Sequence, residues 1–207
     1  MRAAWEWRGF ARALNAGALE SVTADLAGRL NVARPTRALD EDDLYLARAG
    51  LRHNLKLRAG QLEVKRRLDE AGGAVSLWAD KELWSFPLAA EASRALRSWL
   101  PPRTPATEED IASEAALLDR VQTCEQARAV RVRKRRLRLD LGAARLEIAD
   151  VAIPGRPLLR SFCVDGYELE AVRDVVARSA LEGHAAALGY PELIQALVLL
   201  DGDGEAA

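Results

Sequence analysis

The sequence predicts an α+β protein in which helices cover one face of an antiparallel sheet. Three observations support this prediction. Short segments alternate apolar and polar residues, as strands do when successive side chains point to opposite sides. Turn signals such as Ala59-Gly60, Gly142 and Pro154-Gly155 separate several of these segments. Stretches with apolar residues at helical spacing lie between and around the strands.

Length and composition fit a single domain. The chain has 207 residues, and 49% of them are apolar, which is enough to bury a core without disulfides. It carries 30 Lys and Arg against 31 Asp and Glu, which argues against the basic overall surface of a general nucleic-acid coat protein. No apolar run approaches the roughly 20 residues that span a bilayer. Two cysteines and no secretory leader predict a reduced, cytoplasmic protein.

In the N-terminal half we expect strands, a first helix and a meander. Residues 10–30 carry leucines and small apolar residues at helical spacing, which predicts an amphipathic helix. Alternation predicts the strands, and Gly72-Gly73 interrupts it before the last of them. The expected strands are residues 4–8, 43–47, 51–58, 62–67 and 75–86, the last as one long or two short strands.

The C-terminal half should begin with a helical hairpin. Residues 89–100 form its first helix, and the second runs from Thr107 to about residue 126, because Thr107 is a capping residue followed by three acids that suit a helix start. Three strands follow at residues 130–141, 144–153 and 158–165. Helices at residues 168–187 and 191–200 close the chain.

The most charged segment is VRVRKRRLR at residues 130–138, where six cationic side chains fall within eight residues. Val130 and Val132 share a parity that Leu137 and Leu139 do not, which predicts a β-bulge near residues 134–136. With such a bulge, Arg131 and Arg133 lie on the charged face of the sheet. Either Arg135 or Arg136 then joins them.

Two explanations of this charged face stay open. An ordinary antiparallel sheet with helices on one side has a solvated charged face that needs no function. However, cations packed this closely repel one another unless acids between them or a bound anion compensate. If the sheet curls into a barrel, the cations would line a channel suited to a phosphate chain, and a few carboxylates could hold a divalent metal.

The order of these segments resembles that of the CYTH, or triphosphate-tunnel, superfamily over nearly the whole chain, and most strongly that of uncharacterised bacterial CYTH-like proteins. The matching segments are Glu6-Trp7-Arg8, DLYL at 43–46, NLKLR at 54–58, LEVK at 62–65, VRVRKRR at 130–136, LEIAD at 146–150, SFCVD at 161–165 and Tyr190-Pro191. The resemblance implies a closed or nearly closed, eight-stranded antiparallel barrel with flanking helices. It implies one domain at residues 1–200, with a helical hairpin insertion at about 89–126 and a disordered tail at 201–207.

The resemblance also implies triphosphate-containing substrates and Mg or Mn. Members of the superfamily include inorganic, thiamine and RNA triphosphatases and class IV adenylate cyclases. The family's first-strand Glu-x-Glu-x-Lys motif is reduced here to Ala4-Trp5-Glu6-Trp7-Arg8, and its late Glu-x-Glu pair to Cys163-Val164-Asp165. The metal site is therefore matched less completely than the phosphate site.

Carried over position by position, the resemblance gives a candidate site. The expected phosphate ligands are Arg8, Lys56, Arg58, Lys65, Arg131, Arg133 and Arg135. Glu6 and Glu63 would be catalytic, while Glu6, Glu147 and Asp165 would hold the metal, with Asp150 in reserve. Each of these acids has a simpler alternative role as the ion-pair partner of a neighbouring cation.

The leading functional hypothesis is a metal-dependent phosphohydrolase that acts on inorganic triphosphate or a nucleoside triphosphate. The alternative is a non-catalytic module that binds or senses polyphosphate or another phosphoanion with a degenerate metal site. RNA-end or single-strand RNA binding is a weaker alternative. No membrane partner is expected, and a homodimer is compatible with each hypothesis.

Overall fold

The computed structural model describes residues 2–13, 18–32, 35, 38–72, 74–101 and 111–202. The chain divides into two compact units built from alternating segments. Unit 1 comprises Met1–Asp42, Arg67–Asp80 and Val132–Gly189, and unit 2 comprises Asp43–Arg66, Lys81–Arg131 and Tyr190–Ala207. Two strands, β2 (Leu39–Arg48) and β8 (Ala127–Asp140), contribute residues to both units.

Unit 1 contains an antiparallel sheet in the order β5-β6-β1-β10-β9-β8. Its other strands are β1 (Ala3–Arg12), β5 (Arg67–Ala71), β6 (Val75–Ala79), β9 (Ala144–Ala152) and β10 (Leu159–Gly166), and the short β11 (Ala186–Ala187) also pairs with β1. The central registers place Glu6 opposite Asp165 and Cys163 opposite Glu147. Side chains from three neighbouring strands therefore share one polar face.

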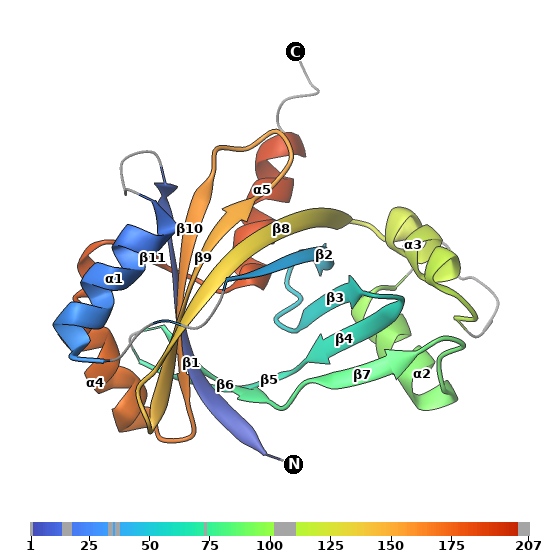
Figure 1. The fold of residues 1–207 in the computed structure, drawn as a ribbon. Coiled ribbons are helices and arrows are strands. Elements are labelled where there is room, and N and C mark those ends of the chain that lie inside the picture. The colour runs from blue at the N-terminus through green and yellow to red at the C-terminus, as the bar shows by residue number, and fades with distance from the viewer. Residues whose placement is uncertain are drawn as a thin grey trace. The chain divides into compact units, whose positions relative to one another are not determined.

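The other face of this sheet is apolar and carries two helices, α1 (Leu19–Leu30) and α4 (Leu169–Ser179). Both helices lie on the same side of β9 and β10 in Figure 1. Trp7, Ile148 and Val164 from the sheet pack with Leu26 and Val172 from the helices, and all five are at least 95% buried. Burial of this core positions β1, β9 and β10, and through them the polar face behind it.

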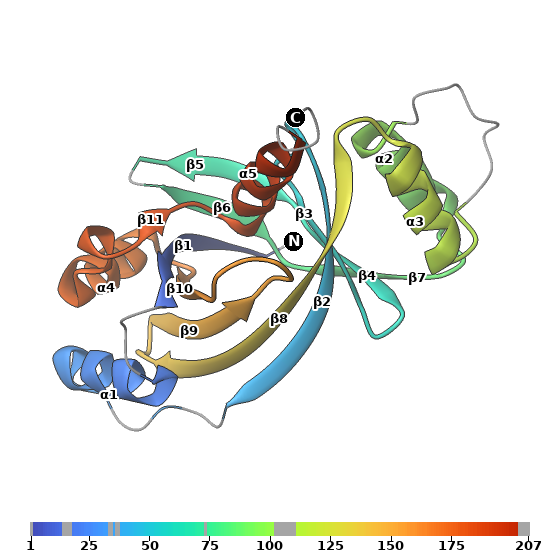
Figure 2. The same cartoon turned by 90° about the horizontal axis from the view of Figure 1, so that it is seen from above.

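Unit 2 contains the antiparallel strand order β2-β3-β4-β7, with β3 (Asn54–Arg58), β4 (Gln61–Lys65) and β7 (Glu82–Ser85). Helices α2 (Ala90–Trp99) and α3 (Glu114–Thr123) lie side by side in Figures 1 and 2. They pack on the apolar side of these strands, where Leu55, Leu62, Leu96 and Leu117 are fully buried. The last helix, α5 (Tyr190–Gly202), contacts β2 through stacked rings of Tyr190 and Tyr45, whose centroids are 4.8 Å apart.

Two pairs of strands are nearly continuous along the chain. Only Arg66 separates β4 from β5, and only Asp80 and Lys81 separate β6 from β7. The hydrogen-bonded order through the described residues contains ten strands, from β5 at one end to β7 at the other. This open order of ten strands differs from the closed or nearly closed, eight-stranded barrel that the resemblance implies.

The predicted α+β class with antiparallel strands is confirmed, but several boundaries were wrong. Residues 10–12 continue β1, because Phe10 pairs with Ser161 and is buried, so the first helix begins only at Leu19. The helix expected at 168–187 ends at Ser179 and is followed by a 3₁₀ helix at Leu181–Gly183 and by β11. Strand β5 was missed, because its sequence RLDEA does not alternate.

Other expectations fall partly outside the described residues. The predicted cap Thr107 lies outside the described residues. Helix α3 begins at Glu114, and its N-cap is Ser113, whose Oγ accepts a hydrogen bond from the Ala116 N–H at 3.2 Å. Gly73, part of the expected break between two strands, also lies outside the described residues. Of the tail expected at 201–207, residues 201 and 202 end α5, and the rest lies outside the described part.

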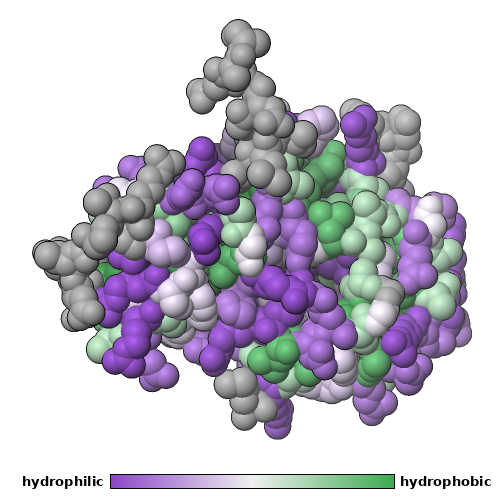
Figure 3. Space-filling model, turned by 180° about the vertical axis from the view of Figure 1, so that it is seen from behind, coloured by the Kyte–Doolittle hydropathy of each residue, from purple (hydrophilic) through white to green (hydrophobic). Residues whose placement is uncertain are grey.

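Hydrophilic side chains dominate the face of the molecule shown in Figure 3, with apolar residues scattered among them. The described part of the chain contains no helix that is long and apolar enough to cross a membrane.

Candidate functional site

The basic strand β8 has a continuous register with β9, which corrects the predicted bulge. Residues Arg133 to Asp140 pair one for one with Ala152 to Arg145, with no shift near residues 134–136. Side chains therefore alternate strictly along this stretch. Arg136 and Arg138 lie on the polar face with Glu147, whereas Arg133 and Arg135 share the opposite face with Leu137.

Three guanidinium groups act on one buried carboxylate, that of Glu147. Arg136 Nη1 and Arg138 Nε each donate a hydrogen bond to Glu147 Oε2 at 3.0 Å. Burial alone would raise the pKa of Glu147, but the positive charges of Arg8, Arg136 and Arg138 lower it below its ordinary value. Glu147 is therefore ionised at neutral pH. This polar group of residues in unit 1 is called the arginine cluster below.

Neighbouring ion pairs complete the polar face of unit 1. Arg8 donates to Glu6 at 3.1 Å and to Ser161 Oγ at 3.0 Å. Arg136 also binds Glu41 through Nη2, while its Nε is buried without a hydrogen-bond partner among the described residues. Arg145 Nη2 lies 2.7 Å from Asp165 Oδ2, and although burial would lower the pKa of Arg145, contact with Asp165 raises it.

The predicted metal ligands share this face, but their arrangement does not fit a metal ion. Glu6 and Asp165 are direct cross-strand partners, and Glu147 lies opposite Cys163, two residues from Asp165. Each of the three carboxylates is engaged by an arginine. Among the residues that the structure describes, no three Asp, Glu, His or Cys side chains come together as a metal site.

Unit 2 has a second group of charges, called the lysine cluster. Lys56 Nζ lies 3.0 Å from Glu63 and 3.5 Å from Asp43, and Lys81 lies 3.6 Å from Glu63. Asp43 is completely buried and also accepts hydrogen bonds from Arg58, one of them from Nη2 at 2.8 Å. Burial raises the pKa of Glu63, but Lys56, Lys81 and Arg58 outweigh it, so the pKa is lowered overall.

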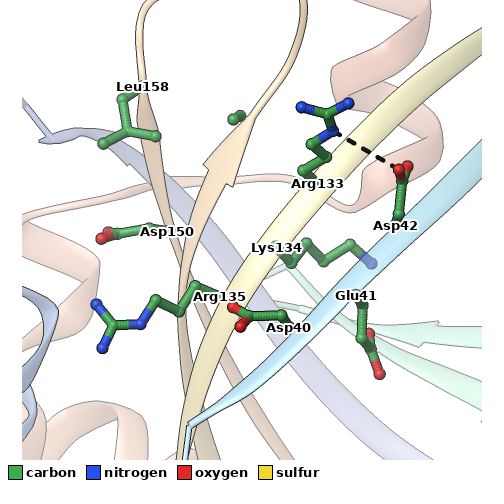
Figure 4. Close-up of a pocket in the computed structure, with 9 residues that line it drawn as sticks. Asp40, Glu41, Asp42, Arg133, Lys134, Arg135, Asp150 and Leu158 are labelled. Carbon is green, nitrogen blue, oxygen red and sulfur yellow. Dashed lines mark ion pairs between the residues drawn. The ribbon is translucent and has the colours of Figure 1, made fainter.

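The remaining predicted residues lie apart from these two clusters. Lys65 is half-buried on β4, opposite Asn54, and Arg131 is exposed on β8. Arg133 and Arg135 line a cavity of about 520 Å³ in unit 1 together with Asp40, Asp42, Asp150 and Leu158 (Figure 4). There Arg133 lies 3.6 Å from Asp42, and Asp150 accepts from the buried Arg160 at 2.7 Å. Arg135 pairs instead with Glu20 on α1.

Cys163 lies on β10 between two members of the arginine cluster, because it pairs with Arg8 on β1 and with Glu147 on β9. Burial raises the pKa of its thiol well above the ordinary value, so the group is protonated and a poor nucleophile at neutral pH. It acts as a small buried residue between charged neighbours.

Sequence reasoning missed Arg138 and Asp43 as members of the clusters and left Arg136 open as an alternative to Arg135. A strand without a bulge would have placed Arg136 and Arg138 opposite the leucines at 137 and 139, so the leucine parity was the available signal. Asp43 offered no signal, because only its complete burial beside two cations distinguishes it from Asp40 and Asp42.

No protein-family model matches the chain, and no curated protein sequence matches it. Solved structures do. The PH1012 protein from Pyrococcus horikoshii OT3 is 14% identical with a TM-score of 0.51, over 91% of this chain and 98% of that chain. A conserved hypothetical protein from Pyrococcus furiosus is 15% identical with a TM-score of 0.47, over 91% and 99% of the two chains.

A Vibrio parahaemolyticus protein proposed to be an adenylate cyclase is 14% identical with a TM-score of 0.42, over 92% of this chain and 97% of that chain. The similarity to PH1012 shows a shared fold over nearly the full length of both chains. At such identities the similarity concerns the fold alone, so the function has to be argued from the site.

Proposed function

We propose that the polar face of unit 1 binds a short phosphoanhydride, such as inorganic triphosphate, through Arg8, Arg136 and Arg138. The observation that carries this proposal is that Arg136 and Arg138 both donate to the largely buried carboxylate of Glu147, while Arg8 lies in the same row of the sheet, opposite Cys163. The three arginine side chains are only 13%, 15% and 28% exposed, so they act on an anion in a partly desolvated setting.

Guanidinium geometry suits this ligand. Each guanidinium has five N–H donors in a rigid fork, so it can hold a carboxylate and a phosphate oxygen together. The buried Nε of Arg136 is a donor without a partner among the described residues, and such a group gains most from a ligand oxygen. Lys56 and Arg58 of unit 2 remain proposed phosphate ligands, because they also surround a buried glutamate.

The expected eight-stranded tunnel belongs to this proposal as well. Its support is the near-continuity of β4 with β5 and of β6 with β7, which reduces the ordered strands to eight. The cation-rich polar face of unit 1 fits a phosphate chain by itself.

Metal-dependent hydrolysis is the second candidate, favoured by the register that puts Glu6, Glu147 and Asp165 on one face of adjacent strands. To hold Mg or Mn, these carboxylates would have to leave Arg8, Arg136 and Arg145. Because the described acids form no metal site as they stand, we derive no catalytic step through a metal. Binding without turnover is therefore the function that the geometry supports best.

The test is calorimetric binding of inorganic triphosphate with EDTA and with Mg or Mn, beside an assay for phosphate release. We expect metal-independent binding. Arg136→Gln with Arg138→Gln should weaken it at least tenfold, because each lost charge-assisted hydrogen bond contributes about 1.5 to 3 kcal/mol. The matched control is Arg133→Gln with Arg135→Gln, which removes two charges from the other face of the same strand.

The control pair should change the affinity less than twofold. If it weakens binding as much as the polar-face pair, the sequence-based assignment of Arg133 and Arg135 is the better one. Binding that requires a metal, together with phosphate release, would replace the binding function with the hydrolase.

A further inference from the structure

We infer that unit 2 carries a separate site for single-stranded nucleic acid, formed by His53, Trp84 and Trp99 with Arg48 and Arg120. The proposal goes beyond phosphoanhydride binding and uses none of the residues assigned to it. Stacked bases and phosphates are the chemistry that half-buried rings and neighbouring arginines recognise together.

The three rings form one partly exposed group. Trp84 and Trp99 are nearly parallel, with an interplanar angle of 13° and centroids 6.0 Å apart. His53 meets Trp99 edge to face at 4.8 Å. All three residues are half-buried, and Trp84 and Trp99 pack against the core of unit 2. Trp84 Nε1 donates to Glu82 at 3.1 Å, which fixes its ring plane.

Two arginines are held beside these rings by the end of α2. Arg48 Nη1 donates to the Trp99 carbonyl at 3.5 Å, and Arg120 Nε donates to the Leu100 carbonyl at 3.0 Å. Among the described residues neither has a carboxylate within ion-pair distance, and each donates to a backbone carbonyl. Each guanidinium thus keeps further donors for phosphate oxygens.

The two arginines exceed what the end of α2 requires. One arginine is enough to cap a helix end, whereas Arg48 and Arg120 donate to the consecutive carbonyls of Trp99 and Leu100. Burial is the main cause that lowers the pKa of Arg120, as expected for a cation held away from water. A phosphate backbone would compensate these two charges, while the rings offer surfaces for bases.

The experiment uses the full chain and a fluorescently labelled decamer of uridines, with inorganic polyphosphate of similar charge as a base-free competitor. We expect the oligonucleotide to bind and the polyphosphate to compete poorly. Arg48→Gln with Arg120→Gln should lower its affinity about tenfold and reduce the salt dependence by about 0.7 for each lost phosphate contact. Glutamine keeps a donor for each carbonyl, so packing is preserved.

Arg173→Gln with Arg178→Gln is the charge-matched control. Both arginines pair with acids in unit 1, and Arg178 also donates to a helix-end carbonyl, that of Leu30. This control should bind the oligonucleotide as the wild type does. A second readout uses Trp84→Phe with Trp99→Phe, which keeps aromatic packing but should remove the quenching of tryptophan emission that base stacking causes.

Three outcomes would overturn the proposal. They are no binding by the wild type, equal loss in the control and test pairs, and equally tight binding of polyphosphate, which would show that charge alone is recognised. Retention of triphosphate binding by the Arg48 and Arg120 variant would show that it is folded and that the two sites are independent.

Discussion

The arginine cluster of unit 1 and the lysine cluster of unit 2 use the same design with different residues. In each, three cations lower the pKa of one buried glutamate, Glu147 or Glu63. Unit 1 uses three arginines, none more than 28% exposed, whereas unit 2 uses two lysines and one arginine, and Lys81 is 56% exposed. Unit 2 adds a completely buried carboxylate, Asp43, that already engages Lys56 and Arg58.

Because each cluster has three cations, the number of cations does not distinguish the two as candidate anion sites. Arginine forks bind phosphate in pairs, while an ammonium is a strongly hydrated point charge. In unit 2 the buried Asp43 already pairs with two of the three cations, Lys56 and Arg58. We therefore expect the arginine cluster to dominate phosphate affinity and the lysine cluster to contribute more to stability.

The largest expected effect is on stability, from Asp43→Asn. The change removes a completely buried carboxylate that pairs with Lys56 and Arg58, and breaking such a buried pair typically costs about 3 to 5 kcal/mol, although Lys56 keeps its pair with Glu63. Urea unfolding measures it. The adjacent Asp42→Asn is the control, because Asp42 is half exposed and its pair with Arg133 should contribute less than about 1 kcal/mol. Equal losses in the two variants would remove the distinction between the clusters.

Next in size is the effect of Glu147→Gln on triphosphate affinity. Loss of this carboxylate frees Arg136 and Arg138, so binding should strengthen about tenfold, as expected when a competing charge worth about 1.4 kcal/mol is removed. Glu63→Gln should strengthen binding less, because Asp43 still holds two cations. Calorimetry compares the two variants. Weaker binding by Glu147→Gln would instead favour a metal-holding role and the hydrolase.

Acid stability sharpens the comparison further. Glu147 and Glu63 both have lowered pKa values in the folded state, so each stabilises the fold fully above its ordinary pKa of about 4.5. This contribution is lost as the pH falls through the lower folded value. We expect the free energy of unfolding to fall below about pH 4.5, and to fall less steeply in either glutamine variant. An unchanged slope would mean that neither cluster is coupled to folding.

The smallest expected effect concerns Cys163. Its buried thiol should react with a disulfide reagent at pH 8 only after unfolding by urea, because burial raises its pKa and blocks access. Cys124 is buried too, so the native chain should show no fast thiol. A Cys163→Ser variant assigns the signal. Fast reaction of Cys163 in the native state would show that the arginine cluster opens readily.

Much of the fold could be predicted from alternation. The strands around Lys56, Glu63 and Glu147 were expected near their observed positions, because each alternates cleanly and has a turn at its end. The errors arose where tertiary pairing overrides local pattern. Phe10 is followed by apolar residues at helical spacing yet pairs with Ser161 in the sheet, and β5 forms although its own residues do not alternate.

The candidate site was only partly predictable for a related reason. Parity along a strand fixes which residues share a face. The assumed bulge put Arg133 on the charged face, whereas the unbroken register puts Arg133 and Arg135 on the face of Leu137. Composition identified the basic strand correctly. Deciding which of its cations meet Glu147 needs the register with β9, which the sequence of one strand does not contain.

The alternation of the two units along the chain limits how the protein can be dissected. The chain passes between them inside β2 and inside β8, and also within the short links at Arg66 and at Asp80. Neither unit is therefore a contiguous piece of sequence, and no terminal truncation isolates one cluster from the other. A loss of strand pairing in one unit extends along the same strand into the other, so we expect thermal unfolding to be a single cooperative transition.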